Sequence, residues 1–306
     1  MTKSQRRRRL VGLVGAAVAV GLLWAWPARR NYYFKRDGVT YRLDVPYTSD
    51  AADPKRRLDL YLPRAAGAGF PVVVFVHGGY WNALDRRWLQ PVLGAYGNVG
   101  VAFATAGVGA AIIGYRQYPR VQTGDASLDD IAGAVRFVRE SCPSWGCDPK
   151  RVFLVGHSAG GHLASLMALD DGVLHRNGLA ADSIAGFASI DGIFDLGASL
   201  ASFTADQATV VRRLFGPDDA ALAAHSPITH ARGGHPPLLF VDSTGDERVC
   251  LDGFRRMKAR MEGEGSPARF VELSGLGHNE IIIRLGMDND PLLPSLLSFV
   301  RAGSGS

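Results

Sequence analysis

The chain of 306 residues has only three cysteines, and no two of them have the CxxC spacing of a structural zinc site. It is therefore neither a small protein stapled by disulfides nor a zinc-ribbon protein. It also lacks internal repeats, and its one low-complexity tract is the last four residues. A hydrophobic content of 47% and a charged content of 21% exclude a disordered or fibrous chain and are typical of one large domain or two small ones.

An excess of charge of one sign is also absent from most of the chain. The formal net charge is +5, but seven of the 34 lysines and arginines lie in residues 1–30, which contain no acid. Residues 31–306 therefore hold 27 basic and 29 acidic side chains, so this part is slightly acidic. The high isoelectric point gives no support for nucleic-acid binding, and we predict no nucleic-acid partner.

The basic start precedes an uncharged run of 17 residues, Leu10–Trp26. As a helix it would span about 25 Å, near the lower limit for a bilayer. We predict a basic cytoplasmic tail (residues 1–9), a transmembrane signal anchor (10–26), a linker (27–40) and a main domain (41–306). The charge bias favours a main domain outside the cytoplasm, periplasmic or extracellular. Two alternatives stay open: a signal peptide cleaved near Ala17–Ala19, giving a secreted protein, and a buried helix.

Two of the cysteines, Cys142 and Cys147, lie five residues apart around Pro143 and Gly146. In an oxidising compartment they would close a small disulfide loop, and otherwise they would be two free thiols. Cys250 has no such neighbour and is expected to act as a small buried hydrophobic residue.

Beyond residue 40, apolar strand-like segments alternate with helical ones. This alternation predicts an α/β fold with a mostly parallel sheet and helices on both faces. Residues 196–230 have weak strand character and are expected to form a small cap or insertion. The predicted strands are 57–62, 71–76, 108–114, 152–155, 184–190, 238–241 and 269–273, and the predicted helices are 127–140, 160–169, 253–262 and 291–301.

A G-x-S-x-G motif occupies residues 156–160, between the predicted strand 152–155 and a helix. Strand, sharp turn and helix are the setting of a nucleophile elbow, which exposes the serine at the edge of the sheet. The small residues on either side of the serine allow strand and helix to approach. The motif therefore predicts Ser158 as the nucleophile, against the simpler interpretation of a structural turn.

Residues 77–81 (HGGYW) directly follow the predicted strand 71–76. The backbone N–H groups of Gly78 and Gly79, together with that of Ala159, are predicted to form an oxyanion hole for a tetrahedral intermediate. The alternative is an ordinary glycine turn after a strand.

A serine hydroxyl needs a base held by a third group. In enzymes with this elbow, the acid and then the histidine follow the serine along the chain. His278 follows the predicted strand 269–273, and Asp246 follows the strand 238–241. We predict His278 as the base and Asp246 as the acid, with Asp242 and Glu247 as rival acids. The other histidines have no metal-ligand spacing, so we predict neither a metal nor a cofactor.

Together these residues resemble the α/β-hydrolase superfamily, from about Leu58 to the C-terminus. Within it, the HGG and GHSAGG motifs resemble the hormone-sensitive-lipase-like and BD-FAE-like carboxylesterases and the kynurenine formamidases. The resemblance implies Ser158, Asp246 and His278 as the triad. Tyr80 and Trp81 are similar to the HGGYW segment of formamidases, which implies a role in substrate binding.

Three functions therefore compete. The leading prediction is a membrane-anchored serine hydrolase that acts on small-molecule carboxylic esters through an acyl-enzyme. The second is a formamidase-like amidase acting on N-formyl aromatic substrates. The third is a non-catalytic, membrane-anchored binding module. The sequence does not predict an oligomeric state.

Overall fold

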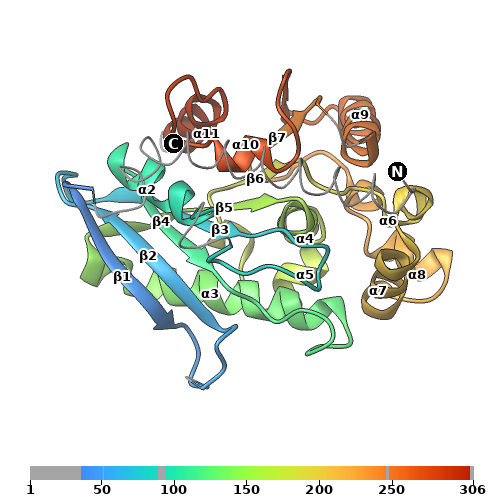
Figure 1. The fold of residues 1–306 in the computed structure, drawn as a ribbon, viewed down its shortest axis with the longest axis horizontal. Coiled ribbons are helices and arrows are strands. Elements are labelled where there is room, and N and C mark those ends of the chain that lie inside the picture. Colours follow the sequence, from blue (N-terminus) through green and yellow to red (C-terminus); the bar gives the residue numbers. More distant parts are fainter. Residues whose placement is uncertain (1–35, 51, 89–93, 246–247, 304–306) are drawn as a thin grey trace, which may run out of the picture. The chain divides into compact units, whose positions relative to one another are not determined.

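Eight strands form a single sheet in the computed structural model, which describes residues 36–50, 52–88, 94–245 and 248–303 (Figure 1). The strand order is β1-β2-β4-β3-β5-β6-β7-β8. The pairs β1–β2 and β2–β4 are antiparallel, and the other five pairs are parallel. The strands are β1 (Val39–Pro46), β2 (Arg57–Pro63), β3 (Phe70–Val76), β4 (Gly109–Ile113), β5 (Cys147–His157), β6 (Gly186–Ile190), β7 (Leu238–Ser243) and β8 (Arg269–Leu273).

The central strands are the ones with continuous apolar sequences. Every residue of β3 and β4 is buried, as expected for strands covered on both faces. The outer strand β1 instead carries exposed residues in its middle, and it starts inside the predicted linker. All seven predicted strands are present, so the predicted α/β architecture is confirmed.

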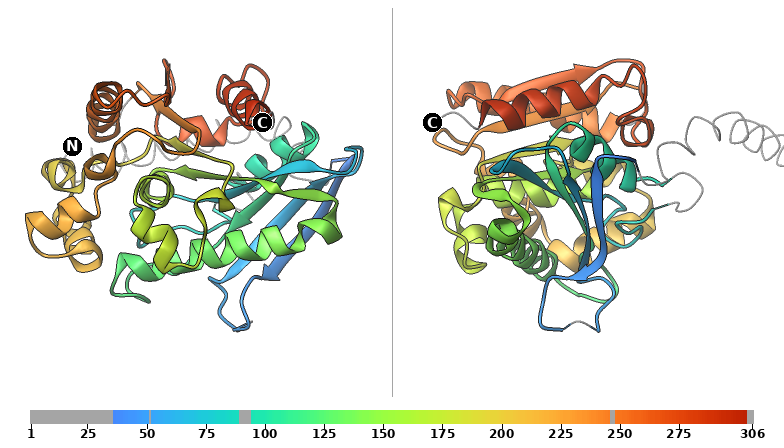
Figure 2. Two further views of the ribbon diagram at one scale, coloured as in Figure 1. Left: turned by 180° about the vertical axis from the view of Figure 1, so that it is seen from behind. Right: turned by 90° about the vertical axis from the view of Figure 1, so that its left-hand side faces the viewer.

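Helices cover both faces of the sheet, and Figure 2 shows the sheet between the green helix α3 and the red helix α11. One hydrophobic cluster joins the sheet to α3, α4 and α9, and a second joins it to α2, α10 and α11. Outside the segment between β6 and β7, the helices in the described residues are α2 (Gly97–Thr105), α3 (Gly124–Trp145), α4 (Ala159–Leu169), α5 (Asp171–Arg176), η1 (Ala181–Ser183), α9 (Arg248–Gly263), α10 (Glu280–Ile283) and α11 (Leu292–Ala302).

The predicted cap segment is a group of short helices between β6 and β7. It comprises α6 (Leu196–Ser199), η2 (Leu200–Ser202), α7 (Ala205–Phe215), α8 (Asp219–Ala224) and η3 (Pro227–His230). Figure 1 shows α6, α7 and α8 gathered next to one another. A hydrogen bond of 2.8 Å between His162 Nε2 and the His225 carbonyl ties this segment to the first turn of α4.

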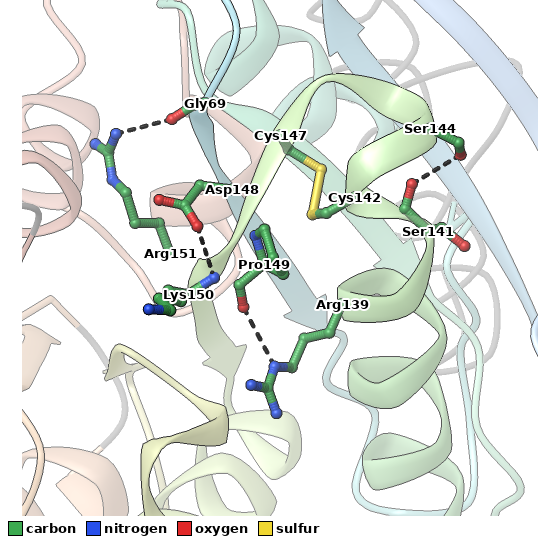
Figure 3. Close-up of a disulfide and its surroundings, with 10 residues drawn as sticks. All are labelled: Gly69, Arg139, Ser141, Cys142, Ser144, Cys147, Asp148, Pro149, Lys150 and Arg151. Atoms are coloured by element: carbon green, nitrogen blue, oxygen red, sulfur yellow. Dashed lines mark hydrogen bonds between the residues drawn. A yellow bond between two sulfur atoms is a disulfide. The ribbon is translucent and has the colours of Figure 1, made fainter.

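A disulfide joins Cys142, in the last turn of α3, to Cys147, the first residue of β5 (Figure 3). Gly146, with φ of 81°, makes the left-handed turn that brings the two together. Arg139 adds a second link, since it donates to the Pro149 carbonyl and to the Ser183 hydroxyl. Of the two alternatives for this cysteine pair, the structure has the disulfide, and Cys250 is a buried thiol outside it.

The described residues from Gly38 onward form one compact unit, which contains the whole sheet. The predicted anchor, Leu10–Trp26, lies outside the described residues. Within the part of the chain that the structure describes, no helix has the length and apolar character needed to cross a membrane.

Candidate active site

Ser158 lies at the turn between β5 and α4, as the motif predicts. Its φ of 57° and ψ of −121° are strained for a residue with a side chain. The Ser158 N–H donates to the Ile190 carbonyl at the end of β6, at 2.9 Å. The turn is thus fixed to the neighbouring strand, and the serine is presented where β5 ends.

The two glycines of the motif allow this tight turn. A Cβ on Gly156 would lie 2.2 Å from the Gly160 carbonyl oxygen, and a Cβ on Gly160 would lie 2.2 Å from the Val76 carbonyl oxygen. No side chain fits at either position. Strand β5, helix α4 and the end of β3 therefore approach closely around the serine.

His278 comes from the loop between β8 and α10. Its Nε2 lies 2.9 Å from the Ser158 hydroxyl oxygen, and both residues are buried. An Nε2 that accepts the hydroxyl proton needs its hydrogen on Nδ1, which is the tautomer of a general base for serine. The structure thus brings together the predicted nucleophile and the predicted base.

The predicted acid, Asp246, and the rival Glu247 lie outside the described residues. Among the described residues, Asp191 alone has a carboxylate oxygen within 4.0 Å of a His278 nitrogen, at 3.5 Å from Nδ1. Sequence reasoning missed Asp191. The available signal was its place directly after β6, at the same edge of the sheet as Ser158.

The other rival acid, Asp242, is buried, and neither of its oxygens has a hydrogen-bond partner among the described residues. Burial, and next the negative charge of Asp191, raise the pKa of Asp242 to about 8. Asp242 is therefore neutral at pH 7. A neutral carboxyl does not stabilise an imidazolium, so Asp242 is poorly suited to serve as the triad acid.

The predicted oxyanion loop, residues 77–81, lies beside the nucleophile. A Cβ on Gly78 would lie 3.0 Å from the Ser158 Cβ. The Gly78 N–H donates to the Tyr96 hydroxyl at 3.0 Å, so it is engaged in this structure, and its role in an oxyanion hole stays a prediction. The N–H of Gly79 takes part in none of the hydrogen bonds among the described residues, and Ala159 begins α4, where N–H groups lack helical partners.

Tyr80 and Trp81 differ in their surroundings. Trp81 is 1% exposed and packs edge-on against His162 and Phe215, with ring centroids 5.2 Å and 5.4 Å away. Its side chain therefore joins the oxyanion loop to α4 and the cap. Tyr80 is partly exposed and contacts Phe203 of the cap at 5.9 Å. Of the two predicted substrate-binding residues, Tyr80 is thus the accessible one.

A buried hydrogen-bond chain connects the oxyanion loop to the base. The His157 Nε2 lies 3.0 Å from the His278 carbonyl, which only accepts, so Nε2 carries the hydrogen. Burial, and next the proximity of His278, lower the pKa of His157 well below its usual value. The neutral ring then accepts at Nδ1 from the Tyr96 hydroxyl, which itself accepts from the Gly78 N–H. His157 is thus a structural link between the two loops.

Three residues of the site lie close enough together to be considered as ligands of a metal ion. Ligand atoms of His157, Asp191 and His278 lie within 4.8 Å of one another. Both ring nitrogens of His157 are engaged, and the Nε2 of His278 accepts from Ser158. A cation would have to break these bonds, so the group is suited to proton transfer.

Comparisons with known proteins agree with this geometry. The BD-FAE family matches residues 58–261. A probable isoprenylcysteine alpha-carbonyl methylesterase of Oryza sativa subsp. japonica is 25% identical over 265 residues, which cover 81% of this chain and 62% of that protein. A kynurenine formamidase of Danio rerio is 29% identical over 161 residues, covering 53% of this chain and 49% of that protein.

A solved structure, a truncated form of a carbohydrate esterase from gut microbiota, superimposes with a TM-score of 0.73. It covers 88% of this chain and 98% of its own, at 21% identity, and it confirms the α/β-hydrolase fold. The chain spans less than two thirds of the length of the two curated relatives. Because the family match covers 204 of the 306 residues and includes both the elbow and the oxyanion loop, the chain belongs to the BD-FAE family.

Proposed function

We propose that this protein is a serine hydrolase of carboxylic esters that works through an acyl-enzyme. The observation that carries the proposal is the 2.9 Å hydrogen bond between Ser158 Oγ and His278 Nε2, made at a left-handed elbow. A serine hydroxyl that only packs or caps a helix does not need an imidazole acceptor or a strained backbone. Together they favour nucleophilic catalysis over the alternative of a non-catalytic module.

The mechanism follows from the positions of the protons. His278 takes the Ser158 proton as Oγ bonds to the ester carbonyl carbon, and the carbonyl oxygen becomes an oxyanion. The N–H groups of Gly79 and Ala159 stabilise that oxyanion, each typically worth about 3 kcal/mol in the transition state. The alcohol leaves with the proton from His278. Water then gives a proton to His278 as its oxygen bonds to the acyl carbon. The bond from that carbon to Ser158 Oγ breaks, Oγ takes the proton back from His278, and the acid is released.

Asp246 remains our proposed triad acid. Its support is the packing of its neighbour: a Cβ on Gly245 would lie 2.1 Å from the Leu276 carbonyl oxygen. The Thr244 N–H also donates to the Leu273 carbonyl, at 3.1 Å. The loop that carries Asp246 therefore starts against the loop that carries His278.

A second candidate function is hydrolysis of N-formyl aromatic amides. The specific observation in its favour is the aromatic contact between Tyr80 and Phe203, which would suit an aromatic substrate. The similarity to a kynurenine formamidase agrees with it. The same triad chemistry would serve, with an amine in place of the alcohol as leaving group.

We also propose that the main domain lies outside the cytoplasm, anchored by residues 10–26 or secreted after cleavage. The Cys142–Cys147 disulfide supports this, because such bonds persist in oxidising compartments. A reporter fused after Arg36 is expected to read out an extracytoplasmic position. A cytoplasmic readout would contradict the proposal.

The test of the activity compares two substrates, p-nitrophenyl acetate and N-formylkynurenine, with Ser158→Ala as the blank. We expect ester turnover well above amide turnover, and none in the variant, whose melting temperature should be unchanged. Amide turnover well above ester turnover would replace the first function by the second. Full activity of Ser158→Ala would refute both.

A further inference from the structure

Asp191 has a constrained backbone next to the Ser158–His278 pair. It follows β6 directly and has φ of 47°, a conformation that Asp and Asn adopt more readily than most residues. Its N–H donates to the Val241 carbonyl of β7 at 2.8 Å, and the carbonyl of the preceding Ile190 accepts from the Ser158 N–H. The backbone at Asp191 is thus fixed relative to both β7 and the nucleophile.

The carboxylate of Asp191 is buried and accepts two hydrogen bonds from Ser243, at the end of β7. The Ser243 N–H donates to Oδ1 at 2.5 Å, and the Ser243 hydroxyl donates to Oδ2 at 2.7 Å. Hydrogen bonds to an ionised acceptor are the strong ones, and two of them fix the orientation of the carboxylate. In that orientation Oδ2 lies 3.5 Å from the Nδ1 of His278.

We propose that Asp191 is a second carboxylate acting on His278, a positioning residue that works alongside the acid of the Asp246 loop. The inference rests on the proposed function, since it assigns Asp191 to the same base. The 3.5 Å separation is longer than a hydrogen bond, so the contribution is electrostatic. It favours the hydrogen on Nδ1 and stabilises the imidazolium.

No proton moves to Asp191 in this account. The Ser158 proton goes to Nε2 of His278, and the ring then carries one positive charge opposite the negative charge of Asp191. Because this attraction is strongest when the ring is charged, it stabilises the transition state more than the bound substrate. Loss of the charge should therefore lower kcat and leave KM nearly unchanged.

Other groups face His278 from each element packed around it. The thiol of Cys250 in α9 lies 3.8 Å from Nδ1, and the ring of His157 in β5 lies 4.8 Å away between centroids. Asp242 in β7 interacts with His278 electrostatically but is neutral at pH 7, because burial raises its pKa to about 8. Among the described residues, Asp191 is thus the carboxylate that is both close to Nδ1 and held by two donors.

The test is Asp191→Asn, which keeps the size of the side chain and its tolerance of positive φ. We expect kcat for p-nitrophenyl acetate to fall by about 10- to 100-fold, with KM within about twofold of the wild-type value. The acid limb of the kcat/KM–pH profile should move to lower pH, because an imidazolium without its anion loses its proton more readily. Active-site titration with a phosphonate corrects kcat for any unfolded fraction.

The matched control is Asp195→Asn. Asp195 lies four residues further along the same loop, where it caps α6 and pairs with Arg256. Its substitution should leave kcat and the acid limb of the pH profile unchanged. An Asp191→Asn kcat within twofold of wild type, or an unshifted limb, would overturn the role of Asp191. Ser158→Ala separates the two claims: if it abolishes turnover while Asp191→Asn is fully active, only the inference on Asp191 fails.

Discussion

Asp242 gives a stability prediction whose size follows from the structure. Its side chain is fully buried in β7, and within the described part of the chain neither carboxyl oxygen has a hydrogen-bond partner. Burial first, and the nearby Asp191 second, raise its pKa from 3.8 to about 8. Between these two values the folded state holds a proton that the unfolded state has released. The contribution of Asp242 to stability therefore falls as the pH rises from about 4 to about 8.

The substitution Asp242→Asn removes this titration and keeps the shape of the side chain. Its free energy of unfolding, relative to wild type, should increase by about 1.4 kcal/mol for each pH unit in that window. Between pH 5 and pH 7 the difference should therefore grow by about 3 kcal/mol. For a domain of this size, that corresponds to an increase of about 6 °C or more in the melting-temperature difference.

The assay is thermal and urea unfolding of both proteins at pH 5, 6 and 7. The control is Glu272→Gln, at the exposed position paired with Asp242 on β8, where the same chemical change should have little effect. A stability difference that does not change with pH would refute the reasoning. It would mean that Asp242 is ionised in the folded protein.

Three further predictions concern the disulfide, the buried histidines and the elbow. Replacing Cys142 and Cys147 together by alanine should lower the free energy of unfolding by about 2 kcal/mol, as measured by urea unfolding, without changing KM. An unchanged free energy of unfolding would contradict a stabilising role for the disulfide. Burial lowers the pKa of His77 to about 4 and that of His162 to about 3. The two neutral histidines therefore contribute fully to the stability of the folded protein above pH 6.5, and this contribution is lost as the pH falls toward 4. A melting temperature that is constant from pH 7 to pH 4.5 would count against neutral histidines. Gly160→Ala should lower kcat/KM by about 100-fold, because the added Cβ would lie 2.2 Å from the Val76 carbonyl oxygen. The control Gly263→Ala, which has open space at its Cβ, should leave kcat/KM unchanged. Equal activity of the two variants would argue against the tight elbow.

The central sheet was predictable because its strands have continuous apolar sequences. A strand such as β3 has no exposed residue, so its sequence leaves little choice of structure. The elbow was predictable for a related reason, since the close approach of β5 and α4 requires glycine at positions 156 and 160. Local sequence constraints of this kind also located His278, which follows the last strand.

Helix α2 and the start of strand β1 are among the elements that escaped prediction, because their sequences lack the expected periodicity. Helix α2 is buried along nearly its whole length and has no polar face, so no 3.6-residue pattern marks it. Its Gly100 packs on the ring of Tyr61, where a Cβ would lie 2.3 Å from the ring. The outer strand β1 is largely polar in its middle, and we assigned its first two residues to the linker.

Within the site, the contacts that the sequence did not predict join distant segments. The engagement of the Gly78 N–H depends on Tyr96, and the position of Asp191 beside His278 depends on the pairing of β6 with β7. No local pattern records either contact. The membrane anchor and the Asp246 role remain predictions, because they concern residues outside the described part of the chain.

The central claim, that Ser158 is a nucleophile activated by His278, can be tested by covalent trapping. The purified protein is incubated with a p-nitrophenyl alkylphosphonate, and the modified peptide is identified by mass spectrometry. The account predicts one equivalent of p-nitrophenol released and one phosphonyl group on Ser158, with no adduct in Ser158→Ala and a much slower reaction in His278→Ala. An adduct on another residue, or an unchanged rate in His278→Ala, would contradict it.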